Sequence, residues 1–369
     1  MSEPQSVFLP RGELQRLLDA LQAGGRRCIG PVEREGALVF ETVTSVEQLP
    51  AGVHDLQAPG SYQLTRDRSP RCFAWANGPQ ALKPETFAPE ETLWRVERDE
   101  QGLRFESASV ERPGVAVIGA RACDLAALAL QEKHFRGNGV ADPLFTARRE
   151  AMFIVAVDCS FPADTCFCAS TGDGPAAASG FDIAMSELDQ GFLLRTRSEA
   201  GRALVGALQL CAATPAQLQE VQEALARAAQ GQTRQLPSRD LRNLLYERQE
   251  HPHWADIASR CLACGNCTAV CPSCFCSASE ARAGLDGVQA EQVRVWDSCF
   301  NVDHSSLHGR PLRDDIGLRY RQWMTHKLAA WHDQFGRSGC TGCGRCITWC
   351  PVGIDLTAEI DLLLGQGAT

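Results

Sequence analysis

The chain has 369 residues, 44% of them hydrophobic and 22% charged, which is typical of a globular protein long enough for two or three domains. Its formal net charge of −9 argues against nucleic acid or an anionic membrane surface as a partner, because both attract basic patches. No run of about 18 apolar residues exists, so no membrane span is predicted.

The first part of the chain predicts helices and short strands. The stretch MSEPQSVFLPRGELQ has no basic region followed by an apolar core, so we expect no secretory signal and a cytoplasmic location. Leucines recur at helical spacing from Leu14 to Leu21, and two glycines follow, so a helix is predicted there. The runs GSYQLTRD and RCFAWANGPQ, broken by glycine and proline, predict strands and turns.

A strand–helix–strand unit is predicted next. GVAVIGA (114–120) and MFIVAVDC (152–159) are apolar enough for buried strands, and DLAALALQEKHF (124–135) between them indicates a helix. This order favours a βαβ unit in a partly parallel sheet. Thr214 and Gln217 then form a capping box for another helix, with Pro215 at its first position.

The polar segment 231–240 breaks the periodicity, and we place a domain boundary there. The sequence therefore predicts an α+β or α/β domain with a mixed sheet over residues 1–235. Residues 236–369 are predicted to form a mainly helical, bacterial-type ferredoxin domain that holds two 4Fe-4S clusters. An apolar helical face, Met324 to Phe335, leads directly into the second half of its cysteine motif.

The cysteines carry the strongest functional signal. A cytosolic location makes disulfides unexpected for the 18 cysteines, and 11 of them lie between Cys261 and Cys350. Eight of these form two copies of a C-x2-C-x2-C-x3-C-P pattern. The first copy is Cys261, Cys264, Cys267 and Cys271, and the second is Cys340, Cys343, Cys346 and Cys350.

In bacterial two-cluster ferredoxins the fourth cysteine of each motif ligates the other cluster. Cluster one is therefore predicted to take Cys261, Cys264, Cys267 and Cys350. Cluster two is predicted to take Cys340, Cys343, Cys346 and Cys271. Small residues between the cysteines leave room for backbone N–H groups to approach the sulfurs and tune the potential. Zinc is the alternative, but zinc sites use paired cysteines with a long spacer, so the spacing favours iron.

A third cluster site is a further hypothesis. Cys123 begins the helix after one strand of the βαβ unit, and Cys159 ends the other strand, so both are expected at the carboxyl edge of the sheet. Cys166 and Cys168 follow in a C-F-C triplet, and the four cysteines could meet there as ligands. The alternative is that they are buried structural thiols, since free cysteine is among the most buried residue types.

The remaining cysteines and the histidines give weaker functional signals. Cys274, Cys276 and Cys299 could shield the ferredoxin clusters or lend a ligand to the third. Cys28, Cys72 and Cys211 are isolated and are interpreted as core or surface thiols. His304 and His326 have no cysteine or carboxylate at ligand spacing, so both are interpreted as ordinary histidines.

No dinucleotide-binding glycine fingerprint, phosphate-binding loop or Ser–His–Asp arrangement can be picked out. The chain thus offers electron-transfer groups without an evident catalytic site. Its motifs together resemble the beta (iron–sulfur) subunit of cytosolic NiFe hydrogenases of the sulfhydrogenase type, to which the A subunit of anaerobic sulfite reductase is related. The resemblance rests on HDLQAPGSYQLTR, FAWANGPQALKP, GARACDLAAL, CFCASTGDGP, GFDIAMSEL, RCLACGNCTAVCPSCFC, VWDSC and GCTGCGRCITWCPVGID.

This resemblance implies a non-catalytic electron-relay subunit of an oxidoreductase complex. Its partners would be the hydrogenase large and small subunits and a flavin subunit with an NAD(P) site, and a sulfur compound is the other acceptor. Two alternatives stay open: the electron-transfer subunit of an anaerobic sulfite reductase, or a stand-alone iron–sulfur sensor or scaffold. Two buried clusters with crossed ligands favour transfer over sensing, because a sensor needs an exposed or labile cluster.

Overall fold

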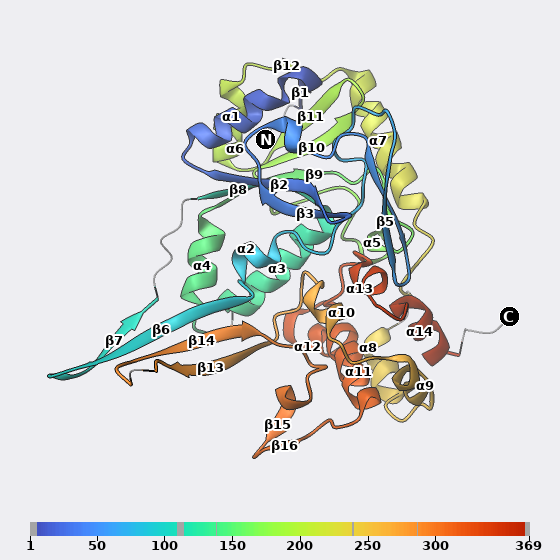
Figure 1. The fold of residues 1–369 in the computed structure, drawn as a ribbon. Helices are drawn as coiled ribbons and strands as arrows, with labels where there is room; N and C mark the ends of the chain where they lie inside the picture. Colours follow the sequence, from blue (N-terminus) through green and yellow to red (C-terminus); the bar gives the residue numbers. More distant parts are fainter. Residues whose placement is uncertain (1–5, 109–113, 138, 238–239, 286, 366–369) are drawn as a thin grey trace.

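The computed structural model describes residues 6–108, 114–137, 139–237, 240–285 and 287–365 (Figure 1). Its largest sheet has eight strands, and the inner pairs β10–β9, β9–β8 and β8–β2 are parallel while the outer pairs are antiparallel. The sheet is therefore mixed, as predicted. In spatial order the strands are β12 (Cys211–Ala212), β1 (Val7–Pro10), β11 (Gly191–Thr196), β10 (Ile183–Leu188), β9 (Met152–Val157), β8 (Val115–Ala120), β2 (Arg27–Arg34) and β3 (Ala37–Thr42).

Helices cover both faces of this sheet, which explains why its central strands are apolar on both sides. Along β9, Phe153 and Val155 pack in one core with leucines of α1, while Ile154 packs in a second core with Leu128 of α3. The helices and helical turns of this part are η1 (Arg11–Glu13), α1 (Leu14–Ala23), η2 (Val46–Gln48), α2 (Lys83–Thr86), α3 (Ala122–Gly137), α4 (Pro143–Glu150), α5 (Cys168–Thr171), α6 (Glu199–Ala207) and α7 (Pro215–Gln230).

The predicted elements of this part are largely present. The leucine helix is α1, the βαβ unit is β8–α3–β9, and the Thr214 capping box begins α7. GSYQLTRD supplies β5 (Ser61–Arg66), which pairs with β4 (Val53–Ala58). Residues 71–80 are an exception, because they form an irregular and mostly buried segment rather than a strand.

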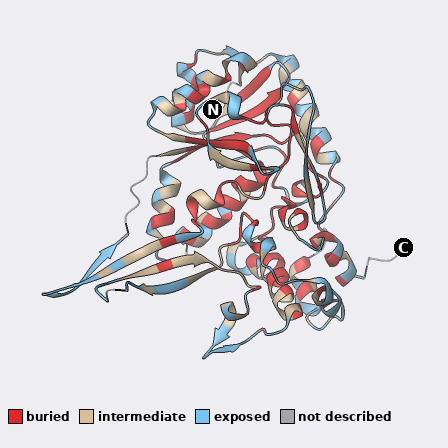
Figure 2. Ribbon diagram, in the orientation of Figure 1, coloured by how far each residue is buried: buried red, intermediate tan, exposed pale blue. Residues whose placement is uncertain are grey.

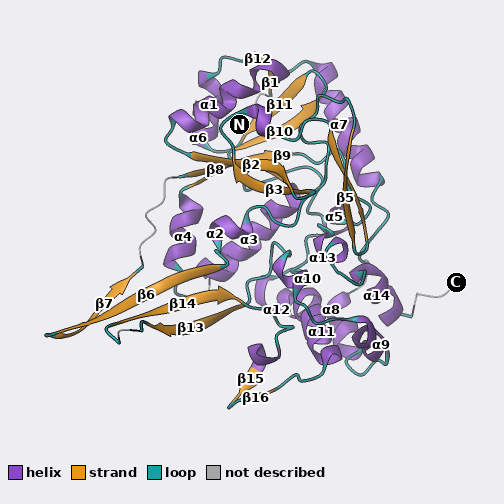
Figure 3. Cartoon of the chain, viewed as in Figure 1, coloured by secondary structure: helices purple, strands orange, loops and turns teal. Residues whose placement is uncertain are grey.

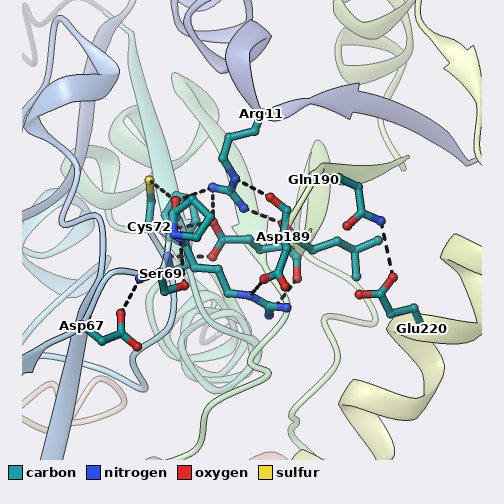
Figure 4. A network of polar contacts seen from close by, with 12 residues as sticks. Arg11, Asp67, Ser69, Cys72, Asp189, Gln190 and Glu220 are labelled. Atoms are coloured by element: carbon teal, nitrogen blue, oxygen red, sulfur yellow. Dashed lines mark hydrogen bonds and ion pairs between the residues drawn. The ribbon is translucent and has the colours of Figure 1, made fainter.

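A buried polar network that includes Arg11 and Cys72 fixes this irregular segment against the large sheet (Figure 4). Glu187 of β10 is only 4% exposed and accepts hydrogen bonds from the backbone N–H groups of Cys72 and Phe73, each at 2.8 Å. Arg11 pairs with the same carboxylate at 2.9 Å. The buried carboxylate of Glu187 is thus both paired and hydrogen-bonded, as a buried charge requires. It holds the backbone segment that continues to Asn77.

Strands from both halves of the sequence form one small sheet. Hairpin β13 (Ser277–Ala283) and β14 (Gln289–Trp296) joins hairpin β6 (Glu90–Asp99) and β7 (Gly102–Ser107) in one four-stranded sheet, through β14 and β6. This sheet projects from the body, and β7 is exposed along its whole length (Figure 2). Residues 277–283 and 289–296 are thus strands, where the sequence predicted a mainly helical region.

The rest of the second half is helical and packs around buried Trp254, Trp323, Met324 and Leu328 (Figure 3). Its helices are α8 (Leu241–Glu247), α9 (His253–Arg260), α10 (Asn266–Ala269), η3 (Val302–Ser305), α11 (Ile316–Thr325), the π-helix η4 (His326–Ala330), α12 (Trp331–Phe335), α13 (Arg345–Thr348) and α14 (Leu356–Leu363). A small hairpin joins β15 (Ser306–Leu307) to β16 (Arg310–Pro311). None of the helices that the structure describes is long and apolar enough to cross a bilayer.

Candidate iron–sulfur sites

The two cysteine motifs fold into equivalent loops. Gly265 and Gly344 both adopt left-handed backbone conformations, with φ of 76° and 74°, and each begins a helix of four residues. Those helices, α10 and α13, carry the third cysteine of each motif, Cys267 and Cys346. Glycine suits the position because a side chain there would be strained. The repeated spacing in the sequence therefore corresponds to a repeated local structure.

The structure brings the eight cysteines together in two crossed sets. The thiols whose charges act on Cys267 are Cys261, Cys350, Cys264 and Cys271, in order of effect. Those that act on Cys346 are Cys340, Cys343, Cys271 and Cys267. Each list contains the other two of the first three cysteines of the same motif, the fourth cysteine of the other motif, and one further thiol, Cys271 or Cys267. We define the set around Cys267 as Cys261, Cys264, Cys267 and Cys350, and the set around Cys346 as Cys340, Cys343, Cys346 and Cys271. The two sets are also neighbours, which suits transfer of electrons between them.

The set around Cys267 lines an apolar hollow. All four thiols of the set face this hollow, and its other walls include Phe300, Tyr320, Trp323, Ile354 and Leu356. Burial raises the pKa of the Cys267 thiol, so without iron this group holds its proton. Four sulfur ligands in an otherwise apolar hollow fit an iron–sulfur cluster, because iron replaces the protons and neutralises thiolates that burial disfavours.

Backbone N–H groups point at the sulfurs in both loops. The N–H of Ala263 lies 3.4 Å from the Sγ of Cys261, and that of Gly342 lies 3.5 Å from the Sγ of Cys340. Both donors follow their cysteine by two residues. The small residues of the motifs thus give the N–H···S contacts that the sequence predicted, and such contacts tune the potential of a bound cluster.

The spacing of the thiols separates a cluster from a single zinc ion. Tetrahedral zinc holds its sulfur ligands at ~2.3 Å, which places them ~3.8 Å apart. Among the described residues, one set of three or more donor atoms lies within 4.8 Å of one another: His253, Asp256 and Glu359. Arg260 already pairs with both carboxylates of that set. No three cysteine thiols among the described residues lie as close together as these donors do.

Two buried lysines lie beside the set around Cys346. The ammonium of Lys327 is 3.0 Å from the hydroxyl of Ser273, and the charges of Cys271, Cys274 and Cys340 raise its pKa although burial opposes this. Lys83 donates to the carbonyl of Cys271 at 3.4 Å and lies over the ring of Trp296. Fixed positive charge near a cluster stabilises its reduced, more negative state. The sequence analysis identified neither lysine.

The structure also brings together Cys123, Cys159, Cys166 and Cys168 at the carboxyl edge of β8 and β9. All four thiols are buried. The charges of Cys159 and Cys168 act on Cys166, and that of Cys168 acts on Cys123. Cys123 and Cys168 also pack against Cys343 of the second ferredoxin motif. This N-terminal cysteine group is therefore contiguous with the set around Cys346.

Several polar contacts lock the N-terminal cysteine group to the second motif. The backbone N–H of Phe167 donates to the carbonyl of Gly342 at 2.8 Å, an approach that leaves no room for a side chain on Gly342. Asn77 donates to the carbonyl of Cys343 at 2.9 Å, and Gln232 reaches the Sγ of Cys168 at 3.3 Å. These residues lie far apart in sequence, so spacing alone could not identify them.

The isolated cysteines behave as interpreted, since Cys28 and Cys72 are buried and Cys211 is exposed. His304 has polar partners that the sequence did not indicate. Its Nδ1 lies 2.5 Å from Asp297, and its ring is hydrogen-bonded to Cys276. The hairpin β13–β14 separates Cys276 from His304 in sequence, whereas Asp297 lies only seven residues before His304.

Comparison with known proteins agrees with this geometry. Residues 260–354 match the family described as 4Fe-4S dicluster domain. The chain is therefore an iron–sulfur protein of the 4Fe-4S type. It is 29% identical over 344 residues to sulfhydrogenase 2 subunit beta of Pyrococcus furiosus, an alignment that covers 91% of each chain. The resemblance to the sulfhydrogenase beta subunit thus extends over nearly the whole length. No solved structure matches the chain.

Proposed function

We propose that this chain is the electron-relay subunit of a NiFe hydrogenase complex. The observation that carries the proposal is the continuous series of thiol groups: the crossed sets adjoin one another, and Cys343 of the second set packs against the N-terminal cysteine group. A relative of nearly equal length bears the name sulfhydrogenase 2 subunit beta. A series of adjacent metal groups without a catalytic arrangement suits a relay.

The ligands that we propose follow the two crossed sets. The first 4Fe-4S cluster is held by Cys261, Cys264, Cys267 and Cys350, and the second by Cys340, Cys343, Cys346 and Cys271. A third is held by Cys123, Cys159, Cys166 and Cys168. Each cluster supplies a one-electron carrier, and the protein supplies apolar walls, N–H···S contacts and buried lysines that set its potential.

In the complex, the relay runs between the hydrogenase large and small subunits, where H2 is oxidised, and an acceptor module. That module is a flavin subunit with an NAD(P) site, or a sulfur compound reduced directly. This chain has no arrangement in its described residues that would itself activate H2. Its contribution is to hold the carriers close together.

The first experiment is anaerobic purification of the tagged chain from its native host. We expect stoichiometric nickel in the purified complex, together with about twelve irons per copy of this chain for its three clusters, measured on the chain after it is separated from its partners. Siroheme in place of nickel would assign the chain to a sulfite reductase. Purification of the chain without any partner would contradict the relay proposal.

The relay itself is tested in the purified complex with Cys264→Ala. Because the hydrogenase subunits are untouched, H2-dependent reduction of an artificial dye should persist, while H2-dependent reduction of the physiological acceptor should fall at least tenfold. Cys211→Ser is the matched control, since Cys211 is exposed and outside every cysteine group. Equal loss of both activities in the Cys264 variant would contradict the assignment.

A further inference from the structure

A fully buried ion pair lies at the junction between the N-terminal cysteine group and the second ferredoxin motif. The guanidinium of Arg345 donates to the Oδ1 of Asp124 at 2.7 Å, and each side chain is only 1% exposed. Asp124 lies in the first turn of α3, and Arg345 is the first residue of α13. Each of these helices carries a cysteine of one group, so the ion pair joins two cysteine groups as well as two halves of the sequence.

The two charges of this pair belong to opposite cysteine groups. Asp124 directly follows Cys123, whereas Arg345 lies between Cys343 and Cys346. Cys123 and Cys343 pack within one buried cluster of thiols, so the ion pair lies where the two groups meet. Burial raises the pKa of both of these thiols; beyond that, Asp124 acts on Cys123 more strongly than Arg345 does, and the order is reversed at Cys343. The negative end of the pair therefore faces the N-terminal group, and the positive end faces the second motif.

Hydrogen bonds fix both ends of the ion pair. The Nε of Arg345 donates to the carbonyl of Gly78 at 2.8 Å, and the backbone N–H of Arg121 donates to the Oδ2 of Asp124 at 3.2 Å. The first contact reaches the buried segment 71–80, and the second comes from the residue just before α3. Held in this way and excluded from water, the two charges form a fixed dipole in a medium that screens them weakly.

Stability alone gives a weak explanation of this ion pair. Taking two charges out of water costs free energy that their attraction offsets only in part, and apolar side chains of similar volume are often as stabilising. The junction also has other contacts, because Phe167 donates to the carbonyl of Gly342 and Asn77 donates to that of Cys343. The effect that remains specific to the pair is its electric field.

We propose that the ion pair of Arg345 and Asp124 raises the reduction potential of the second cluster and lowers that of the third, an inference that rests on the three-cluster relay proposed above. The guanidinium stabilises an added electron at the second cluster, and the carboxylate destabilises one at the third. When one electron leaves the reduced third cluster and reduces the second, the field of the pair favours the transfer. No proton moves and no bond changes in this step. The ion pair thus favours electron flow from the N-terminal group toward the ferredoxin pair.

Other buried charges near these groups act differently. Arg121 donates to the carbonyl of Asp158, next to Cys159, and Lys327 lies beside the set around Cys346. Each is a single positive charge, so each shifts nearby potentials in one direction only. Shifts of opposite sign at two clusters are therefore the signature of the ion pair.

The test is the double variant Asp124→Asn with Arg345→Gln, in the full chain purified without oxygen. Both replacements keep hydrogen-bonding groups but remove the charges. Protein-film voltammetry should show a lower potential for the second cluster and a higher one for the third, at unchanged iron content. The equilibrium distribution of one electron between the two clusters should move toward the third by at least about tenfold. The third cluster is identified as the one whose signal is lost in Cys168→Ser.

Single variants and a control separate charge from packing. Asp124→Asn alone should raise both potentials, that of the third cluster more, because the carboxylate belongs to the residue after Cys123. Arg345→Lys keeps both charges and should leave both potentials near those of the wild type. The control is Arg34→Gln with Glu41→Gln, which neutralises an exposed ion pair of β2 and β3 and should shift neither potential.

Two results would overturn the inference. The first is a double variant with full iron whose two potentials stay unchanged or shift in the same direction. The second, which decides the matter if the double variant loses iron, is an equal shift at both clusters in Asp124→Asn, or a larger shift at the second. A wild-type chain that lacks the four irons of the third cluster would instead contradict the relay proposed above. The two failures are therefore distinguishable.

Discussion

The ferredoxin loops and the N-terminal cysteine group reach the same kind of site by different routes. In the loops, three cysteines lie within a few residues and one left-handed glycine turns the chain around them, so local spacing defines most of the site. In the N-terminal group, Cys123 and Cys159 meet because β8 and β9 are parallel neighbours. A site of the first kind is visible in a sequence, whereas a site of the second kind depends on sheet topology.

The two sites also differ in what they do for the fold. The crossed loops connect segments about eighty residues apart in sequence, and their hollow is walled by buried side chains of the helical core, such as Trp323. The N-terminal group rests on a sheet whose strands are buried on both faces. Loss of metal should therefore disturb the loops more than the N-terminal group, because shared ligation of the clusters is what would join the two distant loops, whereas the N-terminal group is held by a sheet.

The largest effect, a loss of iron from both ferredoxin clusters, is expected for Cys267→Ala. This change removes one ligand from the first set, and because the sets are crossed it also loosens the loop that supplies Cys271 to the second. We expect a loss of at least four and up to eight irons per chain, measured by iron and sulfide analysis after anaerobic purification. Cys28→Ala is the control, because Cys28 is buried but outside every group. Full iron content in Cys267→Ala would contradict the ligand assignment.

A smaller and more local effect is expected for Cys168→Ser. The sheet that carries the N-terminal group keeps its core, so we expect a loss of about four irons while the signals of the ferredoxin pair persist. Redox titration followed by electron paramagnetic resonance distinguishes the two outcomes. If iron were unchanged in this variant, the four cysteines would be buried structural thiols, the alternative that the sequence left open.

This difference also explains how far the sequence could predict the structure. Elements with a strong local signal were predicted correctly: the leucine periodicity of α1, the apolar runs of β8 and β9, and the Thr214 capping box of α7. The outer antiparallel strands β1 and β12 could not be placed, because their partners are distant in sequence. The hairpin β13–β14 was missed because its mostly polar residues show no apolar alternation.

The same reasoning applies to individual residues of the sites. The Cys-x2-Cys spacing identified eight cysteines, since all the information lies within each loop. The proximity of His304 to Cys276 could not be predicted, because these two residues are brought together by the pairing of β13 with β14. Lys327 and Lys83 gave no signal at all, because a lysine becomes informative only when the structure shows it buried beside thiols.

The smallest effect, without loss of iron, is expected for Lys327→Met. Methionine fills a similar volume but removes the positive charge beside Cys271 and Cys340. A unit charge at ~8 Å and an effective dielectric constant near 20 contributes about 2 kcal/mol, which for a one-electron couple is on the order of 100 mV. Reduction adds negative charge to a cluster, and the lysine charge stabilises that state. Without that charge, the reduction potential of one cluster of the ferredoxin pair should become more negative by about that amount.

The potentials would be measured by protein-film voltammetry on the full chain, with the iron content checked in parallel. Lys133→Met is the matched control, since Lys133 is exposed and donates to a backbone carbonyl rather than to a group near sulfur. Lys327→Arg keeps the charge and should stay near the wild-type potential, which separates electrostatic tuning from packing. If the reduction potential shifted equally in the arginine and methionine variants, Lys327 would act through packing and not through its charge. The ferredoxin region would then depend on packing at this position, as the sheet beneath the N-terminal group does.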